Sequence, residues 1–197
     1  MTESNGRFDK HRRERILDAA AHLIAERGVN NVRVADIAKR VGTTSGTVHY
    51  HFEFKDGLLN TAIEWAVTQA FERQAKLLDG IITPKEKLLR IVEIQLPNDQ
   101  QSRHEWSIWL QFWNEASLRP ELRDTHIALN QRWRSGLVEI VEEGIREGDF
   151  KPVNAKDFVD HMQALFNGLG VEVLVGTSTL EHMRATMVSF LKSSLFA

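Results

Sequence analysis

The chain has 197 residues, of which 42% are hydrophobic and 26% are charged, and its formal net charge is -2. This is the composition of an ordinary globular protein, so it argues against extensive disorder and leaves room for one large domain or a small domain joined to a larger one. The absence of cysteine excludes disulfides, thiolate nucleophiles and cysteine-ligated metals.

The first ten residues lack the apolar run of a signal peptide, and no stretch approaches the roughly 20 apolar residues of a membrane span. We therefore expect a cytoplasmic protein with no membrane partner. Residues 1–60 hold ten Lys/Arg against eight Asp/Glu, whereas the remainder holds fifteen against nineteen. This asymmetry has the sign expected if DNA meets the N-terminal part, although a solvated helix start explains the basic cluster equally well. The cluster consists of Arg7, Lys10, Arg12, Arg13 and Arg15.

Apolar residues recur at helical spacing along the whole chain, and no segment alternates like a strand, which predicts an all-α fold of about nine helices. Glycines, prolines and capping residues such as Thr83 and Asn154 mark the expected helix ends. We expect helices at about residues 9–27, 34–41, 45–52, 55–78, 84–97, 102–117, 120–147, 155–175 and 180–194.

The first three predicted helices have the outline of a helix-turn-helix, with Gly42 and Thr43 in the turn and Thr44 as the N-cap of the third helix. Val48 and Phe52, four residues apart, face inward in the third helix. Its other positions are short, polar or aromatic, which suits insertion into a major groove. A plain helical hairpin with a polar surface explains the period alone equally well.

The local sequence favours the first interpretation. Gly42-Thr43-Thr44-Ser45-Gly46-Thr47-Val48-His49-Tyr50-His51-Phe52, followed by Lys55-Asp56-Gly57-Leu58-Leu59, resembles the signature of the TetR family of transcriptional regulators. Ile37-Ala38 and the preceding segment from Ile16 to Gly28 match as well, so the resemblance covers roughly residues 10–60. It implies a repressor that is released from a palindromic operator by a small-molecule effector.

The resemblance also implies the residues that contact double-stranded DNA, with Lys55 and Arg33 on phosphates and the third helix in the groove. These are Arg33, Thr44, Ser45, Gly46, Thr47, His49, Tyr50, His51 and Lys55. Three positions depart from the family pattern. Val32-Arg33 replaces the usual threonine before the second helix, His49 replaces a tyrosine, and Phe54 stands where a serine or asparagine usually caps the fourth helix.

The C-terminal part resembles the ligand-binding domain of BetI-like members of the family, on looser motifs that include Trp106–Trp113 and Asn167-Gly168-Leu169. We expect a DNA-binding domain at residues 1–54 and a ligand-binding and dimerisation domain at residues 55–197. The resemblance implies a homodimer in which the last two helices pair with those of a second copy. An apolar stripe is by itself more typical of an intramolecular core. The stripe residues expected at the interface are Phe158, Met162, Leu165, Phe166, Leu169, Val173, Leu180, Met183, Met187 and Phe190.

Tryptophans 106, 109 and 113 are spaced to share one helix face, which indicates either plain hydrophobic core or the wall of a ligand cavity. If acidic side chains also face inward, the effector is a cation or amine held over aromatic rings. The candidate ligand-binding residues are Trp106, Trp109, Trp113, Glu115, Trp133, Asp160, Asn167 and Glu172.

The sequence carries no motif of metal, nucleotide or nucleophilic catalysis, so we expect no enzyme, no cofactor and no metal site. Two other hypotheses stay open. A helical enzyme or carrier would bind its ligand without sequence-specific DNA affinity. A family member could also act as an activator or as the DNA-binding partner of another regulator.

Overall fold

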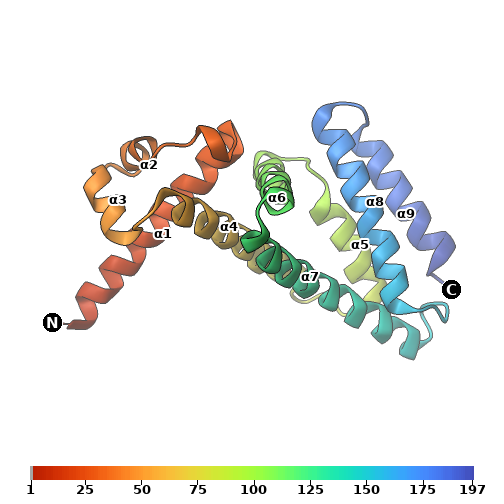
Figure 1. Ribbon diagram of the computed structural model, residues 1–197. Coiled ribbons are helices and arrows are strands. Elements are labelled where there is room, and N and C mark those ends of the chain that lie inside the picture. The colour runs from red at the N-terminus through yellow and green to blue at the C-terminus, as the bar shows by residue number, and fades with distance from the viewer. Residues whose placement is uncertain (1) are drawn as a thin grey trace. The chain divides into compact units, whose positions relative to one another are not determined.

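The computed structural model describes the backbone of residues 2–197 and the side chains of residues 9–197 except Glu121, so Arg7 of the basic cluster lies outside the described side chains. These residues form nine α-helices and one short 3-10 turn, with no strand, which confirms the all-α prediction (Figure 1). The helices are α1 (Thr2–Arg27), α2 (Val34–Val41), α3 (Ser45–His51), α4 (Lys55–Leu78), α5 (Pro84–Gln95), α6 (Gln100–Leu118), α7 (Pro120–Glu147), α8 (Ala155–Val175) and α9 (Leu180–Ser194), and the 3-10 turn is η1 (Val29–Asn31).

Most helix bounds agree with the sequence prediction to within two residues. The exceptions are α1, which begins at Thr2 rather than near residue 9, and η1, which was not expected. Local chemistry explains why α5 ends where it does and how α6 begins. Leu96 precedes a proline and is extended, with φ -70° and ψ 129°, because a following proline disfavours helical backbone. The Asp99 carboxylate then accepts a hydrogen bond from the Ser102 N–H at 2.7 Å and fixes the start of α6.

The chain divides into two compact units. The first comprises residues 1–70 and 107–126, and the second comprises residues 71–106 and 127–197. Helices α4, α6 and α7 each begin in one unit and end in the other. The boundary predicted between residues 54 and 55 stays a prediction.

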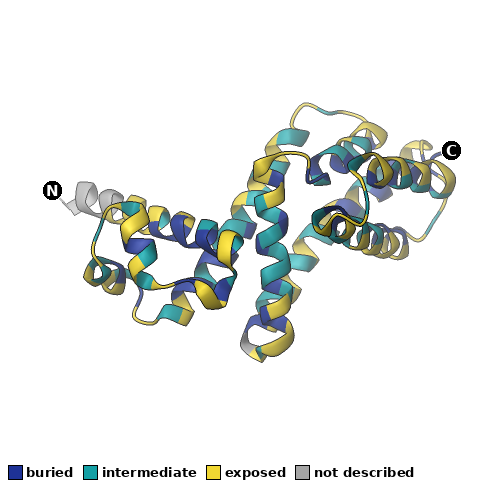
Figure 2. Ribbon diagram, turned by 90° about the horizontal axis from the view of Figure 1, so that it is seen from above, coloured by how far each residue is buried: buried dark blue, intermediate teal, exposed yellow. Residues whose placement is uncertain are grey.

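In the first unit, one face of α1 forms the core with residues of α2 and α3. Ile16, Ala20 and Ile24 are fully buried, and so are Ile37 of α2 and Val48 of α3. In Figure 2 the helices of this unit show buried residues on one side and exposed residues on the other. These apolar contacts fix α3 against α1 and α2, so the remaining faces of α3 are left to solvent.

In the second unit, α8 and α9 lie side by side and bury their apolar stripes (Figure 1). Met162, Met183 and Met187 are fully buried there. Trp106 packs on Gly170 so closely that a Cβ at Gly170 would overlap its ring. Among the described residues, every helix is too short or too polar to span a membrane.

Candidate functional site

Two local features set the turn between α2 and α3. Gly42 ends α2 in the left-handed region, with φ 69° and ψ 40°, which favours glycine. Thr44 is extended, and its side-chain oxygen accepts a hydrogen bond from the Thr47 N–H at 3.2 Å. The glycine and the threonine cap therefore stop one helix and start the next within three residues, as the sequence predicts.

Most of the predicted DNA contacts are accessible on the first unit. Tyr50 is 80% exposed, and the other accessible positions divide into exposed and half-buried ones. Arg33, Thr44, Gly46 and His49 are exposed, whereas Ser45, Thr47 and Lys55 are half-buried. Residues four apart on a helix share a face, so the pairs Ser45/His49 and Gly46/Tyr50 form adjacent rows on α3. Their contact with DNA stays a prediction.

His51 does not point outward, and this expectation was wrong. Its side chain is only 4% exposed, and its Nε2 atom lies 3.6 Å from an oxygen of Asp9 on α1. The reason is helical spacing, because His51 follows the fully buried Val48 by three residues and so lies on the same inward face of α3. The His51 side chain therefore packs on the inward side of α3 without a hydrogen bond at Nε2, and it is removed from the set of candidate DNA contacts.

Two arginines of the basic cluster also stabilise this unit. The Arg13 guanidinium lies 5.0 Å from the centre of the Phe52 ring, and Arg15 donates a hydrogen bond to the carbonyl oxygen of Val41 at 3.0 Å. The side chain of Arg33 makes no capping hydrogen bond at the start of α2, as expected from the departure at that position. Arg33 is exposed, which leaves its charge available to a phosphate.

The tryptophans of α6 separate into the two units. Trp106 belongs to the core of the second unit, where its indole N–H donates to the carbonyl oxygen of Gln95 at 2.9 Å. Trp109 and Trp113 belong to the first unit and are half-buried, with ring centres 6.1 Å apart. Trp109 also stacks on His126 at 5.5 Å. The core interpretation therefore holds for Trp106, and an aromatic surface forms around Trp109.

Of the three acidic candidates for an inward position, only Glu115 faces inward. Glu115 is 2% exposed and forms an ion pair with Arg119 at 3.0 Å. Asp160 and Glu172 are exposed on α8, and Asp160 is paired with Arg134 of α7. Helical spacing left these two residues outside the apolar stripe of α8, which faces the core. Asn167 is half-buried.

The second unit contains a cavity of about 220 Å³. Its lining includes Trp133, which the sequence singled out, and Arg132, the one charged residue among the lining residues. The remaining lining residues were not predicted, because α4, α5 and α7 contribute to one cavity only after they pack. They are Phe71, Gln74, Ala75, Leu78, Ile91, Ile94, Gln95, Gly136, Leu137 and Ile140.

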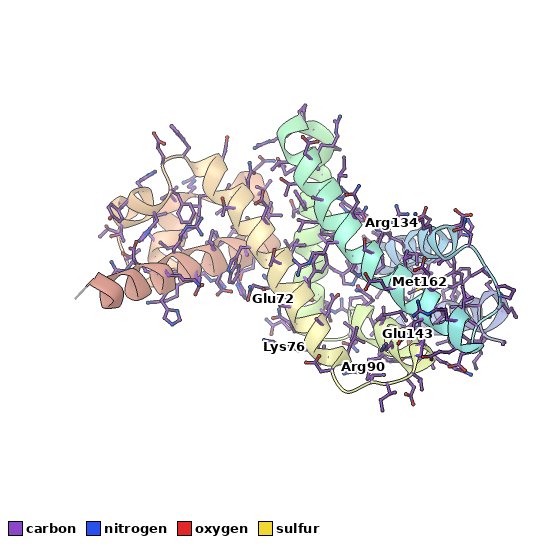
Figure 3. The ribbon with its side chains drawn as sticks, turned by 90° about the horizontal axis from the view of Figure 1, so that it is seen from below. Glu72, Lys76, Arg90, Arg134, Glu143 and Met162 are labelled. Carbon is purple, nitrogen blue, oxygen red and sulfur yellow. The ribbon has the colours of Figure 1, made fainter. Side chains whose placement is uncertain are left out.

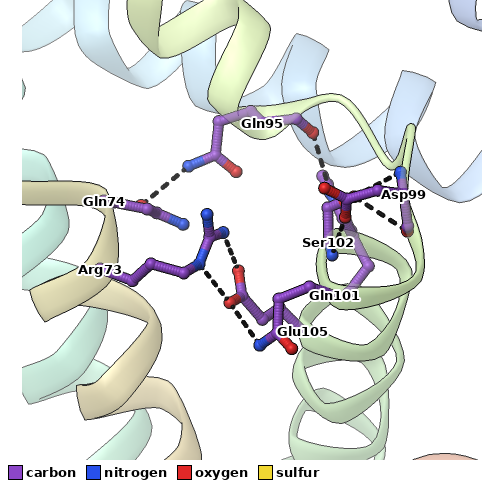
Figure 4. Close-up of polar contacts among 8 residues, drawn as sticks. Arg73, Gln74, Gln95, Asp99, Gln101, Ser102 and Glu105 are labelled. Atoms are coloured by element: carbon purple, nitrogen blue, oxygen red, sulfur yellow. Dashed lines mark hydrogen bonds and ion pairs between the residues drawn. The ribbon is translucent and has the colours of Figure 1, made fainter. Parts of the chain in front are cut away.

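A polar network lies beside this cavity (Figure 4). Arg73 of α4 makes two parallel hydrogen bonds with Glu105 of α6, at 2.8 and 2.6 Å, and this carboxylate raises the pKa of the arginine. Gln95 donates to Gln74 at 3.2 Å. The network ties α4, α5 and α6 together within the second unit, because bidentate arginine–carboxylate pairs fix orientation as well as distance.

Most of the predicted dimer stripe is occupied by the chain's own core, so that assignment was wrong for six residues. Phe158, Met162, Phe166, Val173, Met183 and Met187 are all buried within one chain. The stripe repeats at helical spacing whether its cover is intramolecular or a second copy, and the spacing alone does not distinguish them. Leu165, Leu169, Leu180 and Phe190 are half-buried. No group of His, Asp and Glu among the described residues is arranged to hold a metal ion.

Comparison with known proteins agrees with this geometry. Residues 16–62 match the profile of the bacterial regulatory proteins of the tetR family, and residues 84–195 match the BetI-type transcriptional repressor C-terminal domain. The chain is 35% identical over 127 residues to the HTH-type transcriptional regulator BetI of Stenotrophomonas maltophilia, a match that covers 64% of this chain and 65% of the relative. It thus spans somewhat less than two thirds of that relative's length.

One solved structure has a fold similar to that of this chain over almost the whole length of both chains. It is a transcriptional regulator from Saccharomonospora viridis in complex with choline, with a TM-score of 0.89 and 38% identity over 95% of this chain and 99% of that one. The HTH-type transcriptional repressor KstR2 of Mycolicibacterium smegmatis is 28% identical over 72% of this chain and 68% of its own length. With its helix-turn-helix, its all-α fold and both family profiles matched, the chain belongs to the TetR family, with a C-terminal domain of the BetI type.

Proposed function

We propose that this chain is a sequence-specific transcriptional repressor, which a small-molecule effector releases from a palindromic operator. The observation that carries the proposal is the α2–α3 turn, where Gly42 and Thr44 present a short polar helix whose outer face stays exposed. Residues 1–54 would bind DNA, and residues 55–197 would bind the effector and form the dimer.

The composition of the α3 surface supports insertion into a major groove. Gly46 has no side chain between backbone and DNA, and an added Cβ would have the Thr44 hydroxyl, at 3.7 Å, as its only close neighbour. His49 and Tyr50 supply hydrogen-bonding groups with different reach. Lys55 and Arg33 supply positive charge at the two helix starts on either side. Phosphate contacts of this kind position a helix, and side chains on its outer face read the base edges.

A palindromic operator requires a two-fold symmetric protein, with half-sites about 34–36 Å apart. We propose that the faces of α8 and α9 turned away from the core form the dimer. Between charged residues these faces carry small and apolar side chains, and Val175 is 65% exposed. Small residues let helices approach closely. The exposed small residues are Ala164, Gly168, Ala185 and Ser189.

We propose an amine or quaternary ammonium compound as the effector class. The choline complex of the relative from Saccharomonospora viridis supports this class. In this chain the half-buried rings of Trp109 and Trp113, with centres 6.1 Å apart, supply the aromatic surface for a cation, and His126 covers one face of Trp109. The cavity beside Trp133 is less suitable for a cation, because Arg132 is its one charged lining residue.

The test is a titration of the purified protein with its operator fragment in the absence and presence of choline. Release at choline concentrations that leave a scrambled fragment unaffected supports both the repressor and the effector class. Operator binding that choline does not change, while calorimetry shows no choline binding, would reject the amine class and leave the repressor assignment intact. Absence of any sequence-specific binding would reject the repressor itself.

A further inference from the structure

Among the phenylalanines whose side chains are described, Phe54 alone is exposed. It lies between α3 and α4 with 68% of its surface exposed, whereas the other described phenylalanines are buried or half-buried. With most of its surface exposed, Phe54 contributes little to the hydrophobic stabilisation of the fold. Its ring is therefore available to contact another molecule.

Phe54 also stands at the start of α4, where a residue without a capping oxygen lowers the stability of the helix. Its carbonyl oxygen accepts a hydrogen bond from the Leu58 N–H at 3.1 Å, which makes it the N-cap residue of α4. A phenyl ring cannot accept the hydrogen bonds of the first backbone N–H groups. The starts of α5, α8 and α9, in contrast, are capped by the side-chain oxygens of Thr83, Asn154 and Thr179. Phe54 thus replaces a stabilising cap with an exposed apolar ring.

The position of Phe54 is continuous with the proposed DNA surface. Tyr50, four residues earlier on α3, is 80% exposed, and Lys55 follows directly as the first residue of α4. Two large exposed side chains thus bracket the end of the recognition helix. Of the other large exposed apolar side chains that are described, none lies between residues 33 and 55.

The charges around Phe54 indicate which part of DNA it meets. Lys55 is flanked by the exposed carboxylates of Glu53 and Asp56, so residues 53–56 carry a net negative charge. The two carboxylates therefore offset part of the attraction between Lys55 and a phosphate, and an additional apolar contact would strengthen binding at this end of the surface. The sugar carbons of the backbone offer an apolar surface beside each phosphate, and an apolar ring gains from covering it.

We propose that Phe54 packs against the deoxyribose carbons next to the phosphate that Lys55 binds, and so strengthens operator binding by an apolar contact. This inference rests on the proposed repressor function. It differs from a base contact, because sugar carbons are the same in every sequence and carry no 5-methyl group of thymine.

The decisive variant is Phe54→Ser, which removes the ring and restores a capping oxygen. We expect its melting temperature to rise while its operator affinity falls by about tenfold, because covering a phenyl ring is worth at least that factor. The salt dependence of binding should stay unchanged, since no charge is removed. Phe54→Leu should keep most of the affinity. Ile82→Ser, at an apolar residue that is 83% exposed in the second unit, is the matched control and should leave affinity unchanged.

An operator in which uracil replaces every thymine distinguishes the two kinds of contact. If Phe54 packs on sugars, the ratio of wild-type to Phe54→Ser affinity is the same on both operators. A ratio that falls to one on the uracil operator would overturn the sugar contact in favour of a thymine methyl. Equal affinities of wild type and Phe54→Ser on the natural operator would overturn the inference altogether. If the wild type itself shows no preference for the operator, the proposed function has failed.

Discussion

The side-chain oxygen of Thr44 accepts a hydrogen bond from the Thr47 N–H at 3.2 Å, and the hydroxyls of the two residues lie 3.1 Å apart. This cap matters because α3 has only seven residues, and isolated helices of that length are not stable in water. Thr44 therefore stabilises the first turn of the recognition helix and also lies on its exposed surface. The bond between the hydroxyls also orients Thr47 before DNA is present.

Thr44→Ala should lower the free energy of unfolding by about 1 kcal/mol, because one N–H of the first turn loses its acceptor. It should also weaken operator binding, since the first turn of α3 frays. Thr179→Ala is the matched control, because Thr179 caps α9 through the His182 N–H at 3.1 Å. Urea unfolding should show similar losses for both variants, and operator titration should show a loss for Thr44→Ala alone. Equal operator affinities of the two variants would contradict a role for this cap in recognition.

Lys55→Ala should weaken binding to the operator and to random DNA by similar factors. Removing one phosphate-binding charge should reduce the slope of log K against log salt by about 0.9. Lys76, labelled in Figure 3 near the C-terminal end of α4, provides a control with the same change of charge on the same helix. Titrations at several salt concentrations should give wild-type slopes for Lys76→Ala. The phosphate contact is refuted if the two variants have the same slope.

Thr47→Ala should weaken the operator complex more than the complex with random DNA, because a recognition-helix side chain acts on base edges. Fluorescence anisotropy with both fragments measures the two losses. Thr61→Ala removes the same hydroxyl from α4, where it donates to the Gly57 carbonyl oxygen at 2.7 Å, and serves as the control. Losses of the same size on both fragments would show that Thr47 only positions the backbone.

Acid should destabilise the fold through His126. Burial against Trp109 and Phe112 lowers the pKa of this imidazole, and its Nε2 atom has no hydrogen-bond partner. The folded chain therefore holds fewer protons than the unfolded chain, in which the histidine pKa is about 6.5. Stability contributed by the neutral ring is fully present above that value and is lost as the pH falls from it toward and through the lowered pKa of the folded chain.

His126→Gln should remove this part of the pH dependence. Urea unfolding at about pH 7.5 and about pH 5.5 should show a smaller loss for His126→Gln than for the wild type. His161→Gln, on an exposed histidine of α8, is the control and should behave as the wild type. A wild-type loss on acidification in His126→Gln would show that other groups account for it.

Gly170→Ala should destabilise the second unit by about 1–3 kcal/mol, because the new methyl group overlaps the ring of Trp106. Gly136→Ala on α7 adds the same methyl group in open space and should raise stability, since alanine favours a helix over glycine by about 1 kcal/mol. Thermal unfolding compares the two. A Gly170→Ala protein as stable as the wild type would show that Trp106 relocates without cost.

The sequence predicted the helices well because their ends are marked by local chemistry. Thr83, Asn154 and Thr179 all accept the capping hydrogen bonds that their residue types favour. Gly176 takes the left-handed conformation that ends α8. None of these features depends on distant parts of the chain, so spacing and residue type were sufficient.

The errors concern which surface covers a side chain, and this depends on packing. The buried position of His51 follows from its spacing of three residues after the buried Val48, which the sequence itself contains. Met162 and Met183 could not be assigned in this way, because a stripe looks the same whether its own chain or a partner covers it. Arg132 and Gln95 line one cavity only because two helices far apart in sequence meet there.

The most direct test of the repressor assignment is a selection of genomic DNA fragments by the purified protein, followed by footprinting of the best fragment across salt concentrations. We predict a protected palindrome, bound by a dimer and tighter than random DNA by about 10³ or more. Weak binding with no protected site, in the presence and absence of choline, would contradict the account.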